Sequence, residues 1–190
     1  LDKVQQYTRN MNEVTAWVDT TDSTLSEITN SLTRVQELVT QAANDTNTPD
    51  EREKMAVEIK QIRLQIQDLA NTQIGDKYIF SGTHTQSPLF SNGTIADPAA
   101  KTGLMKNVEI EVGDNIQLAV NVPGHDLFKS IDDMLLKITS DPKNIADPTV
   151  GGAEIGSFLT DVQNAVGDVL DVQAQVGATQ NRVETINNRL

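Results

Sequence analysis

The side chains best suited to acid–base or metal chemistry in this sequence are two histidines, His84 and His125. Imidazole titrates near neutral pH and is a common metal ligand, but a catalytic or metal site also needs partner groups at a suitable spacing. Neither histidine has another histidine or a carboxylate at such a spacing. We therefore interpret both as surface or turn residues, and we predict no catalytic residue, no metal site and no cofactor.

A second candidate is the oxygen-rich segment at 45–50, which reads Asp-Thr-Asn-Thr-Pro-Asp and superficially matches a calcium-binding loop. It lacks the Gly at the sixth position and the Glu at the twelfth that such a loop requires, so capping of the next helix explains it better. We interpret the glycosylation sequons at 44–46 and 92–94 as loop and turn residues. The many acidic residues could hide a carboxylate pair, but no phosphate loop or GxSxG elbow is present, and we predict that the protein is not an enzyme.

Charge and composition narrow the classes of partner. The 27 Asp and Glu residues outnumber the 15 Lys and Arg residues, and the net charge of −12 repels phosphate backbones and anionic lipid. We therefore predict no binding to nucleic acid or to a membrane. Cysteine is absent, which excludes disulfides and thiolate metal sites. Aromatic residues make up only 4% of the chain, so packing must rely on aliphatic side chains, which suits helix seams.

The first element that must position any site is a long helix over about residues 4–44. Its apolar residues recur at spacings of three and four, at positions 4, 7, 11, 14, 18, 25, 28, 32, 35 and 39, with Thr21 as the polar exception. This heptad pattern is typical of a coiled coil or a long bundle helix. At about 1.5 Å per residue such a helix would be roughly 65 Å long.

A second helix is predicted from Pro49, because Thr48 can act as its N-cap and Glu51 completes a capping box. A short loop makes it the antiparallel neighbour of the first helix. Val57 and Leu64 lie off its seam, so we predict contact with a second neighbour through them.

The last helix is predicted from Glu154 to Leu190, with apolar seam residues at 155, 159, 162, 166, 169, 176, 183 and 190. Gln173, Gln180 and Asn187 occupy further seam positions, where polar residues set register or partner number. We therefore expect this helix to exchange partners along its length. Gly177 costs about 1 kcal/mol relative to Ala inside a helix, and we expect a neighbouring backbone to approach it closely.

Between these helices the apolar period changes to two. The alternation over Val108–Val122 predicts a β-hairpin with one buried face and a three-residue turn at 113–115. Further strands are predicted at Tyr78–Phe80 and 89–90, with a turn at 92–93. A short amphipathic helix should follow, and we expect the aperiodic linker from Ser140 to Gly152 to be an exposed loop.

These elements predict an α+β fold that is mainly α: an elongated bundle of long antiparallel heptad helices, two N-terminal and one C-terminal, with a small β-rich insertion. We expect a helical rod domain at 1–74 and 154–190. The inserted outer domain should span 75–153, with hairpins and one short helix at about 125–139. The residues predicted to pack the helix seams are Val14, Val18, Leu25, Ile28, Leu32, Val35, Ile59, Ile62, Ile66, Leu69, Leu159, Val162, Val166, Val169 and Val176.

Three stretches, at 70–90, 120–128 and 176–184, carry a recognisable pattern. Its residues in the first and third stretches are Asn71, Thr72, Tyr78, Ile79, Phe80, Ser81, Gly82, Thr83, Pro88, Phe90, Gly177, Asn181 and Arg182. The chain thereby resembles the bacterial flagellin superfamily, and more narrowly the FlgL family of hook-associated proteins at the hook–filament junction. Leu89 departs from the pattern, because many relatives have Phe directly after the Pro.

The resemblance implies a structural subunit without catalysis, in which the helices form a rod and the β-rich insertion faces outward. It implies export of the unfolded chain through the flagellar type III channel, without a cleaved signal peptide, to the extracellular flagellum. The family forms a homo-oligomeric ring between the hook-associated protein FlgK and flagellin. We also expect that both ends of this chain are cut within longer helices, that an export chaperone could bind the missing ends, and that this fragment is monomeric.

Two alternatives remain at this stage. One is flagellin itself, which a full-length chain would reveal by forming long filaments without other subunits. The other is a helical-bundle signalling or sensor domain, against which the hairpin at 108–122 argues; a carbohydrate-binding insertion is conceivable but has no supporting motif. For the junction hypothesis, we expect exposed helix positions such as Arg52 and Arg63, and the turn at 78–83, to contact neighbouring subunits.

Overall fold

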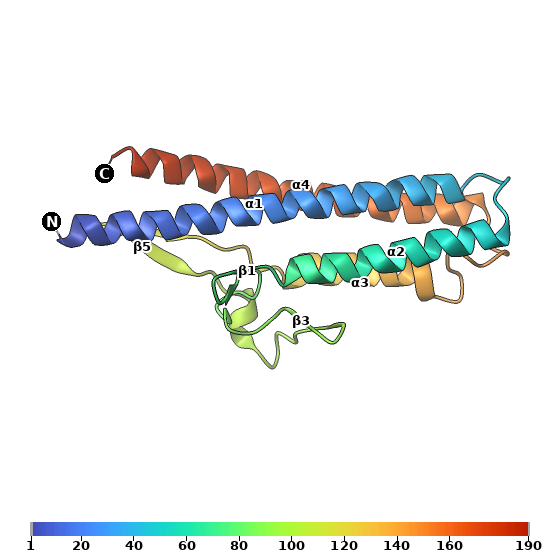
Figure 1. Ribbon diagram of the computed structural model, residues 1–190, viewed down its shortest axis with the longest axis horizontal. Coiled ribbons are helices and arrows are strands. Elements are labelled where there is room, and N and C mark those ends of the chain that lie inside the picture. Colours follow the sequence, from blue (N-terminus) through green and yellow to red (C-terminus); the bar gives the residue numbers. More distant parts are fainter. Residues whose placement is uncertain (1, 190) are drawn as a thin grey trace. The chain divides into compact units, whose positions relative to one another are not determined.

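The computed structural model describes residues 2–189, in which two helices are followed by three short antiparallel hairpins and then by two further helices. The helices are α1 (Asp2–Ala42), α2 (Pro49–Ala70), α3 (His125–Ser140) and α4 (Gly152–Asn187) (Figure 1). The hairpins pair β1 (Gln73–Ile74) with β2 (Lys77–Tyr78), β3 (Phe90–Ser91) with β4 (Thr94–Ile95), and β5 (Glu109–Gly113) with β6 (Ile116–Ala119). A 3-10 helix, η1 (Thr102–Met105), precedes the last hairpin. The predicted class, a mainly α member of the α+β folds, is confirmed.

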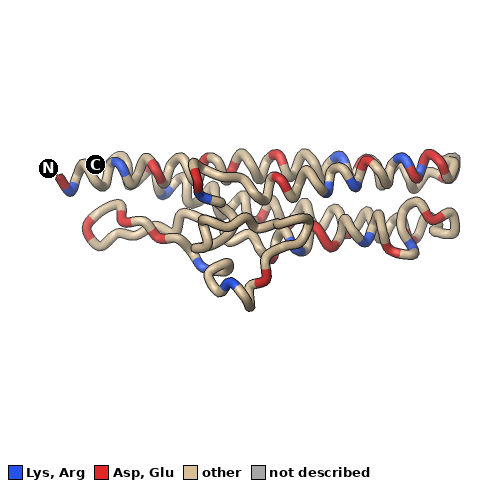
Figure 2. Tube along the Cα trace, turned by 60° about the horizontal axis from the view of Figure 1, so that its bottom comes forward, with Lys and Arg blue, Asp and Glu red and all other residues tan. Residues whose placement is uncertain are grey.

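The contacts within the chain divide it into two compact units. Unit 1 contains Leu1–Ser26, Ala70–His125 and Asp171–Leu190, whereas unit 2 contains Glu27–Leu69 and Asp126–Leu170. Basic side chains occur among the more numerous acidic ones along the helices (Figure 2). Within residues 2–189, none of the helices offers the run of uncharged apolar sequence that crossing a bilayer requires.

The two units cut across the domain bounds expected from the sequence. The sequence predicts that the short helix α3 lies in the β-rich insertion, but most of α3 belongs to unit 2 together with α2. Conversely, the first part of α1 belongs to the same unit as the hairpins. The existence of an outer domain at 75–153 stays a prediction.

Unit 2 is a bundle formed by α2, α3 and the adjoining parts of α1 and α4. Its buried apolar side chains include Ile28, Leu32, Val35, Leu38, Val39, Ile59, Ile62, Ile66, Phe128, Ile131, Leu135, Ile138, Phe158, Val162 and Val169. Polar pairs join neighbouring helices at the edges of this core. Arg34 of α1 donates to both carboxylate oxygens of Glu58 of α2, at 3.0 and 3.1 Å, and Lys137 of α3 lies 3.5 Å from Asp161 of α4.

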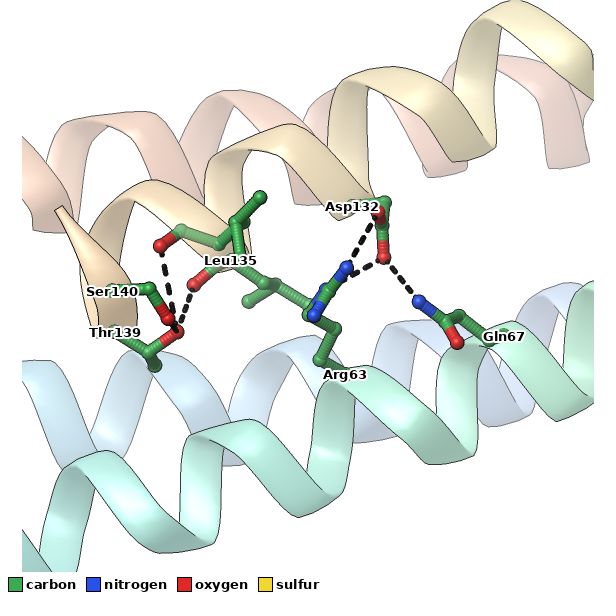
Figure 3. A network of polar contacts seen from close by, with 7 residues as sticks. Arg63, Gln67, Asp132, Leu135, Thr139 and Ser140 are labelled. Carbon is green, nitrogen blue, oxygen red and sulfur yellow. Dashed lines mark hydrogen bonds and ion pairs between the residues drawn. The ribbon is translucent and has the colours of Figure 1, made fainter. Parts of the chain in front are cut away.

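The least exposed of these polar clusters centres on Asp132 of α3 (Figure 3). Arg63 of α2 donates through Nε to Oδ1 at 2.8 Å and through Nη2 to Oδ2 at 3.1 Å, and Gln67 donates to Oδ1 at 2.8 Å. The side chains of Arg63 and Asp132 are only 21% and 14% exposed. A two-point guanidinium–carboxylate contact is strongly directional, so it defines how α2 and α3 pair.

Unit 1 combines the hairpins with the beginning of α1 and the end of α4. Its largest fully buried side chains are Met11, Trp17, Leu25, Ile79, Phe80, Leu89, Leu104 and Leu118. Gln173 of α4 donates to Asp22 Oδ1 at 3.1 Å and to Ser26 Oγ at 2.7 Å, and Gln180 donates to Asp19 Oδ1 at 3.0 Å. Two of the polar residues noted on the α4 seam therefore bond to α1.

The predicted helix boundaries agree closely with the structure. α1 ends at Ala42, and the backbone N–H of Glu51 donates to Thr48 Oγ1 at 3.2 Å, as an N-cap requires. Asn92 and Gly93 both have positive φ, 52° and 79°, and form the turn predicted between β3 and β4. Local hydrogen bonding determines these features, which is why the sequence suffices to locate them.

Most of the residues predicted for the seams are buried, but three of them, Leu69, Leu159 and Val166, are half-buried. In α4 the side chains of Phe158 and Ala165 turn inward instead of those at 159 and 166. The spacing of three and four is compatible with either choice, and the larger Phe158 takes the inward position.

Three expectations about helix faces and loops are wrong. α2 does contact two neighbours, α1 through Glu58 and α3 through Arg63, but not through Val57 and Leu64, which are 52% and 48% exposed. A Cβ built on Gly177 would meet no atom within 4 Å, so no neighbouring backbone approaches that glycine closely. The linker at 140–152 is not wholly exposed, because Ile145 and Val150 are buried and the Ile145 N–H donates to the Ile138 carbonyl at 2.8 Å.

Two strand predictions are also corrected. Of the apolar run at 78–80 only Tyr78 lies in a strand; Ile79 and Phe80 form a buried turn, because their apolar character reflects burial rather than extension. In the β5–β6 hairpin, Gly113 pairs with Ile116, so the connection has two residues rather than three. The register shifts between Glu111 and Gly113, which is the irregularity of a β-bulge.

The Asp132 cluster predicts a difference between two adjacent carboxylates. Asp132→Asn should lower the free energy of unfolding by about 2–3 kcal/mol, because it leaves the partly buried Arg63 charge unpaired. The control is Asp133→Asn: Asp133 forms an exposed pair with Lys129, and its loss should cost about 0.5 kcal/mol or less. Urea unfolding followed by circular dichroism measures both, and equal effects would contradict the prediction.

Candidate functional site

The described residues hold no group of three or more His, Cys, Asp and Glu side chains that could bind a metal. His84 lies in the turn after β2, where its backbone N–H donates to the Ser81 carbonyl at 3.0 Å. His125 is buried at the start of α3. The interpretation as a surface or turn residue is therefore wrong for His125, and the candidate site is better sought among the motif residues.

Residues 71–90, here called the motif loop, run from the end of α2 to β3. The side chain of Asn71 joins the two ends of this loop. Asn71 donates through Nδ2 to the Phe90 carbonyl at 2.8 Å and accepts from the Phe90 N–H at 2.9 Å. This pair of bonds imitates a strand pairing between residues far apart in the loop. Asn71 thereby closes the motif loop, and Ala would leave both backbone groups of Phe90 without that partner.

Inside the motif loop, short main-chain bonds and buried side chains define the path. The Tyr78 N–H donates to the Thr85 carbonyl at 2.8 Å, and the Ile79 N–H donates to the Thr72 carbonyl at 3.1 Å. Ile79 and Phe80 are fully buried, which attaches this turn to the core of unit 1. The turn at 78–83, which is predicted to contact neighbouring subunits, therefore contains buried residues as well as accessible ones.

Gly82 and Thr83 bind the motif loop to η1. Gly82 has a φ of +59°, and a Cβ on it would collide with the carbonyl oxygens of Gly103 and Leu104. Thr83 donates to the Gly103 carbonyl through its N–H at 2.9 Å and through Oγ1 at 3.2 Å. Only glycine combines this conformation with so close a backbone approach, which explains the Ser-Gly-Thr sequence physically.

The hairpin β5–β6 is attached to the start of α1 by polar contacts. The Tyr7 hydroxyl donates to Asp114 Oδ1 at 2.8 Å, and Asn10 donates through Nδ2 to the Glu111 carbonyl at 2.7 Å. The hydrogen bond to Asp114, helped by partial burial and by the charges of Asp114 and Glu111, raises the pKa of Tyr7 to about 12. The neutral phenol is therefore the form that holds the hairpin.

The structure brings together some predicted residues and separates others. Asn71 and Phe90 contact each other within the motif loop, whereas Gly82 and Thr83 both contact η1. The other motif residues, Gly177, Asn181 and Arg182, lie on α4, and the last two are exposed. Pro88 is half-buried, and Thr72, Tyr78, Ile79, Phe80 and Ser81 complete the loop.

The two arginines expected to be exposed contact positions are placed differently. Arg52 is 9% exposed, and the Arg63 side chain is paired with Asp132, so charge reversal at either would disturb the fold directly. Sequence reasoning also missed Gly103 and Asn10, whose partners lie 20 and 101 residues away. No local pattern signals such contacts, because both partners look like ordinary loop or surface residues.

Comparisons with known proteins agree with this architecture. Residues 1–85 match the family model of the bacterial flagellin N-terminal helical region. The chain is 25% identical, over 96% of its length, to flagellar hook-associated protein 3 of Escherichia coli (strain K12), and 30% identical, over 97%, to flagellin of Bacillus subtilis (strain 168). It spans 64% and 62% of the lengths of these relatives. The crystal structure of FlgL from Bacillus cereus matches it with a TM-score of 0.78, at 24% identity, over 99% of this chain and 89% of that one.

Gly82 should tolerate no side chain. Gly82→Ala is expected to lower the free energy of unfolding by more than about 3 kcal/mol, because positive φ and collision with η1 act together. Gly93→Ala is the matched control: its φ is +79°, but a Cβ there meets no atom within 4 Å, so the loss should be about 1 kcal/mol. Thermal unfolding measures both, and equal losses would show that the approach to η1 does not matter.

The Tyr7 contact predicts a dependence on alkaline pH. Because the pKa of Tyr7 is raised in the folded protein, its stabilising effect is fully present below about pH 10 and is lost as pH rises toward 12. In a Tyr78→Phe variant, phenolate absorbance reports Tyr7 alone and should have a midpoint near 12. Asp114→Asn should return that midpoint toward 10. A midpoint near 10 in the folded Tyr78→Phe protein, checked by circular dichroism, would refute this account.

Proposed function

Because this chain belongs to the flagellin superfamily, we propose that it is a structural subunit of the bacterial flagellum that joins the hook to the filament. The observation that carries this proposal is the 25% identity to a flagellar hook-associated protein across 96% of the chain. The motif loop and the packed helix seams support it, since they build a scaffold of the kind that a structural subunit needs.

The finer proposal concerns assembly. The subunit would form a homo-oligomeric ring between FlgK and flagellin, outside the cell, after export as an unfolded chain without a cleaved signal peptide. The absence of cysteine supports that route, because the chain can refold after export without forming disulfides. Val57 and Leu64 of α2 are the apolar side chains that we propose for subunit contacts, since they lie seven residues apart on one exposed face.

Flagellin itself is the second candidate function, and one observation favours it. The Bacillus subtilis flagellin is 30% identical to this chain, which is a higher identity than that of the hook-associated relative. A filament subunit would use the same helix seams and the same motif loop. The two functions differ in whether the protein is needed in bulk or only at the junction.

Deletion of the gene in the source bacterium tests the proposal. If the protein joins hook to filament, cells without it should keep hooks, lose filaments and release soluble flagellin into the medium. Immunoblots of the medium and electron microscopy of the cells measure this outcome, and expression of the full-length gene should restore filaments. Cells that retain normal filaments would overturn the junction role. Loss of filaments without any released flagellin would support the filament-subunit alternative instead.

A further inference from the structure

At one end of unit 2, the loops that precede α2 and α4 enclose a small polar cavity of about 300 Å³, here called the loop cavity. Figure 1 shows both loops at the same end of the bundle. The wall includes the end of α1 and the first turns of α2 and α4. The residues used below are Asn44, Asn47, Arg52, Gly151 and Gly152, all of which line the cavity.

Arg52 supplies a buried positive charge with unused donors. Its side chain donates through Nη2 to the Val150 carbonyl at 3.2 Å, and the residue is only 9% exposed. Its Nε is buried and has no hydrogen-bond partner within residues 2–189. A guanidinium has five N–H donors and stays charged at any relevant pH, so a buried one lacking acceptors calls for an anionic partner.

Two helix N-termini border the same cavity. α2 begins at Pro49 and α4 begins at Gly152, and the unpaired backbone N–H groups at such ends carry partial positive charge. A Cβ built on Gly151 or Gly152 would meet no atom within 4 Å. The backbone at the start of α4 can therefore be approached closely by a ligand.

Of the nearby carboxylates, Asp45 lines the cavity itself, whereas Asp147 and Glu154 accept hydrogen bonds in the loop before α4. Asp147 accepts from the Thr149 N–H at 2.9 Å and from its hydroxyl at 2.8 Å; these bonds, and then the charges of Lys143 and Arg52, lower the pKa of Asp147. Glu154 accepts from the Gly151 N–H at 3.0 Å and lies 3.7 Å from Lys143. Asp147 and Glu154 balance part of the local charge, but neither carboxylate accepts a hydrogen bond from Nε of Arg52.

A cation does not suit the loop cavity, although the segment at 45–50 resembles a calcium loop. Asn44 accepts from both the N–H and the hydroxyl of Thr46, and Asn47 donates to main-chain carbonyls, so these amides are used by the turn itself. A buried guanidinium in the wall repels cations. The donors of the Arg52 guanidinium favour an anion, while Asp45 in the same wall offsets its charge.

We propose that the loop cavity binds a small oxyanion through the Arg52 guanidinium and the first amide groups of α4. The planar donor arrangement of Arg suits a carboxylate or a phosphate group, and both present oxygens that the guanidinium N–H groups and a helix N-terminus can share. A bound oxyanion would connect the loop before α2 to the loop before α4, and so order this end of the bundle.

The binding test uses the 190-residue chain and two probes, inorganic phosphate and acetate, with sodium chloride at equal ionic strength as the control. In proton–nitrogen NMR spectra, the Arg52 Nε–H and Gly152 amide signals should shift saturably below about 50 mM probe. At ten times the Kd, the Tm should rise by about 3 °C. A stronger effect of phosphate indicates a phosphate site, and an effect of acetate alone indicates a site for carboxylates. Shifts that equal those in chloride would overturn the proposal.

Variants separate this site from general salt effects. Arg52→Met keeps the length of the side chain but removes its charge and donors, so the rise in Tm with phosphate or acetate should be lost. Arg34→Met is the matched control, because Arg34 lies in the same unit but pairs with Glu58 away from the cavity lining, and it should keep the response. An unchanged response in Arg52→Met would overturn the proposal. If that variant does not fold, the spectra of the unaltered chain decide.

Discussion

Burial of one apolar seam on each helix is the interaction on which the rest of this structure depends. α1 provides buried side chains from Met11 to Ala42, and its partners change along its length because it contributes to both compact units. These side chains are mostly medium-sized aliphatic groups, whose attraction is strong in sum but not directional. The seams therefore explain why the helices pack, but they do not by themselves select which neighbour packs where.

Hydrogen bonds between polar side chains determine which helices pack together and in which register. In unit 1, Gln173 and Gln180 bond α4 to Asp19, Asp22 and Ser26 of α1. In unit 2, the Asp132 carboxylate takes up donors from two side chains of α2. Each pair loses its partner if a helix slides by one turn, so these bonds penalise wrong registers more than they add to stability.

The motif loop places strict demands on the sequence for structural reasons alone. Asn71 replaces a strand partner for Phe90, and Gly82 permits a backbone approach that no other residue allows. Such closures hold the loop in one conformation, because opening either of them would free backbone groups that are now paired or closely packed. Arg52 at the end of unit 2 differs from these closures, because its Nε–H donor has no hydrogen-bond partner among the described residues.

The sequence by itself determined the helices, the Thr48 cap, the turn at 92–93 and the existence of the β5–β6 hairpin, because these depend on neighbours within a few residues. The sequence also identified the residues of the motif through their resemblance to the flagellin superfamily. Only the tertiary structure decided that Phe158 rather than Leu159 is buried, that α3 belongs to unit 2, and that Arg52 is buried. Asn10 finds its partner 101 residues away, and such a contact has no local signature, because its geometry exists only once the chain has folded.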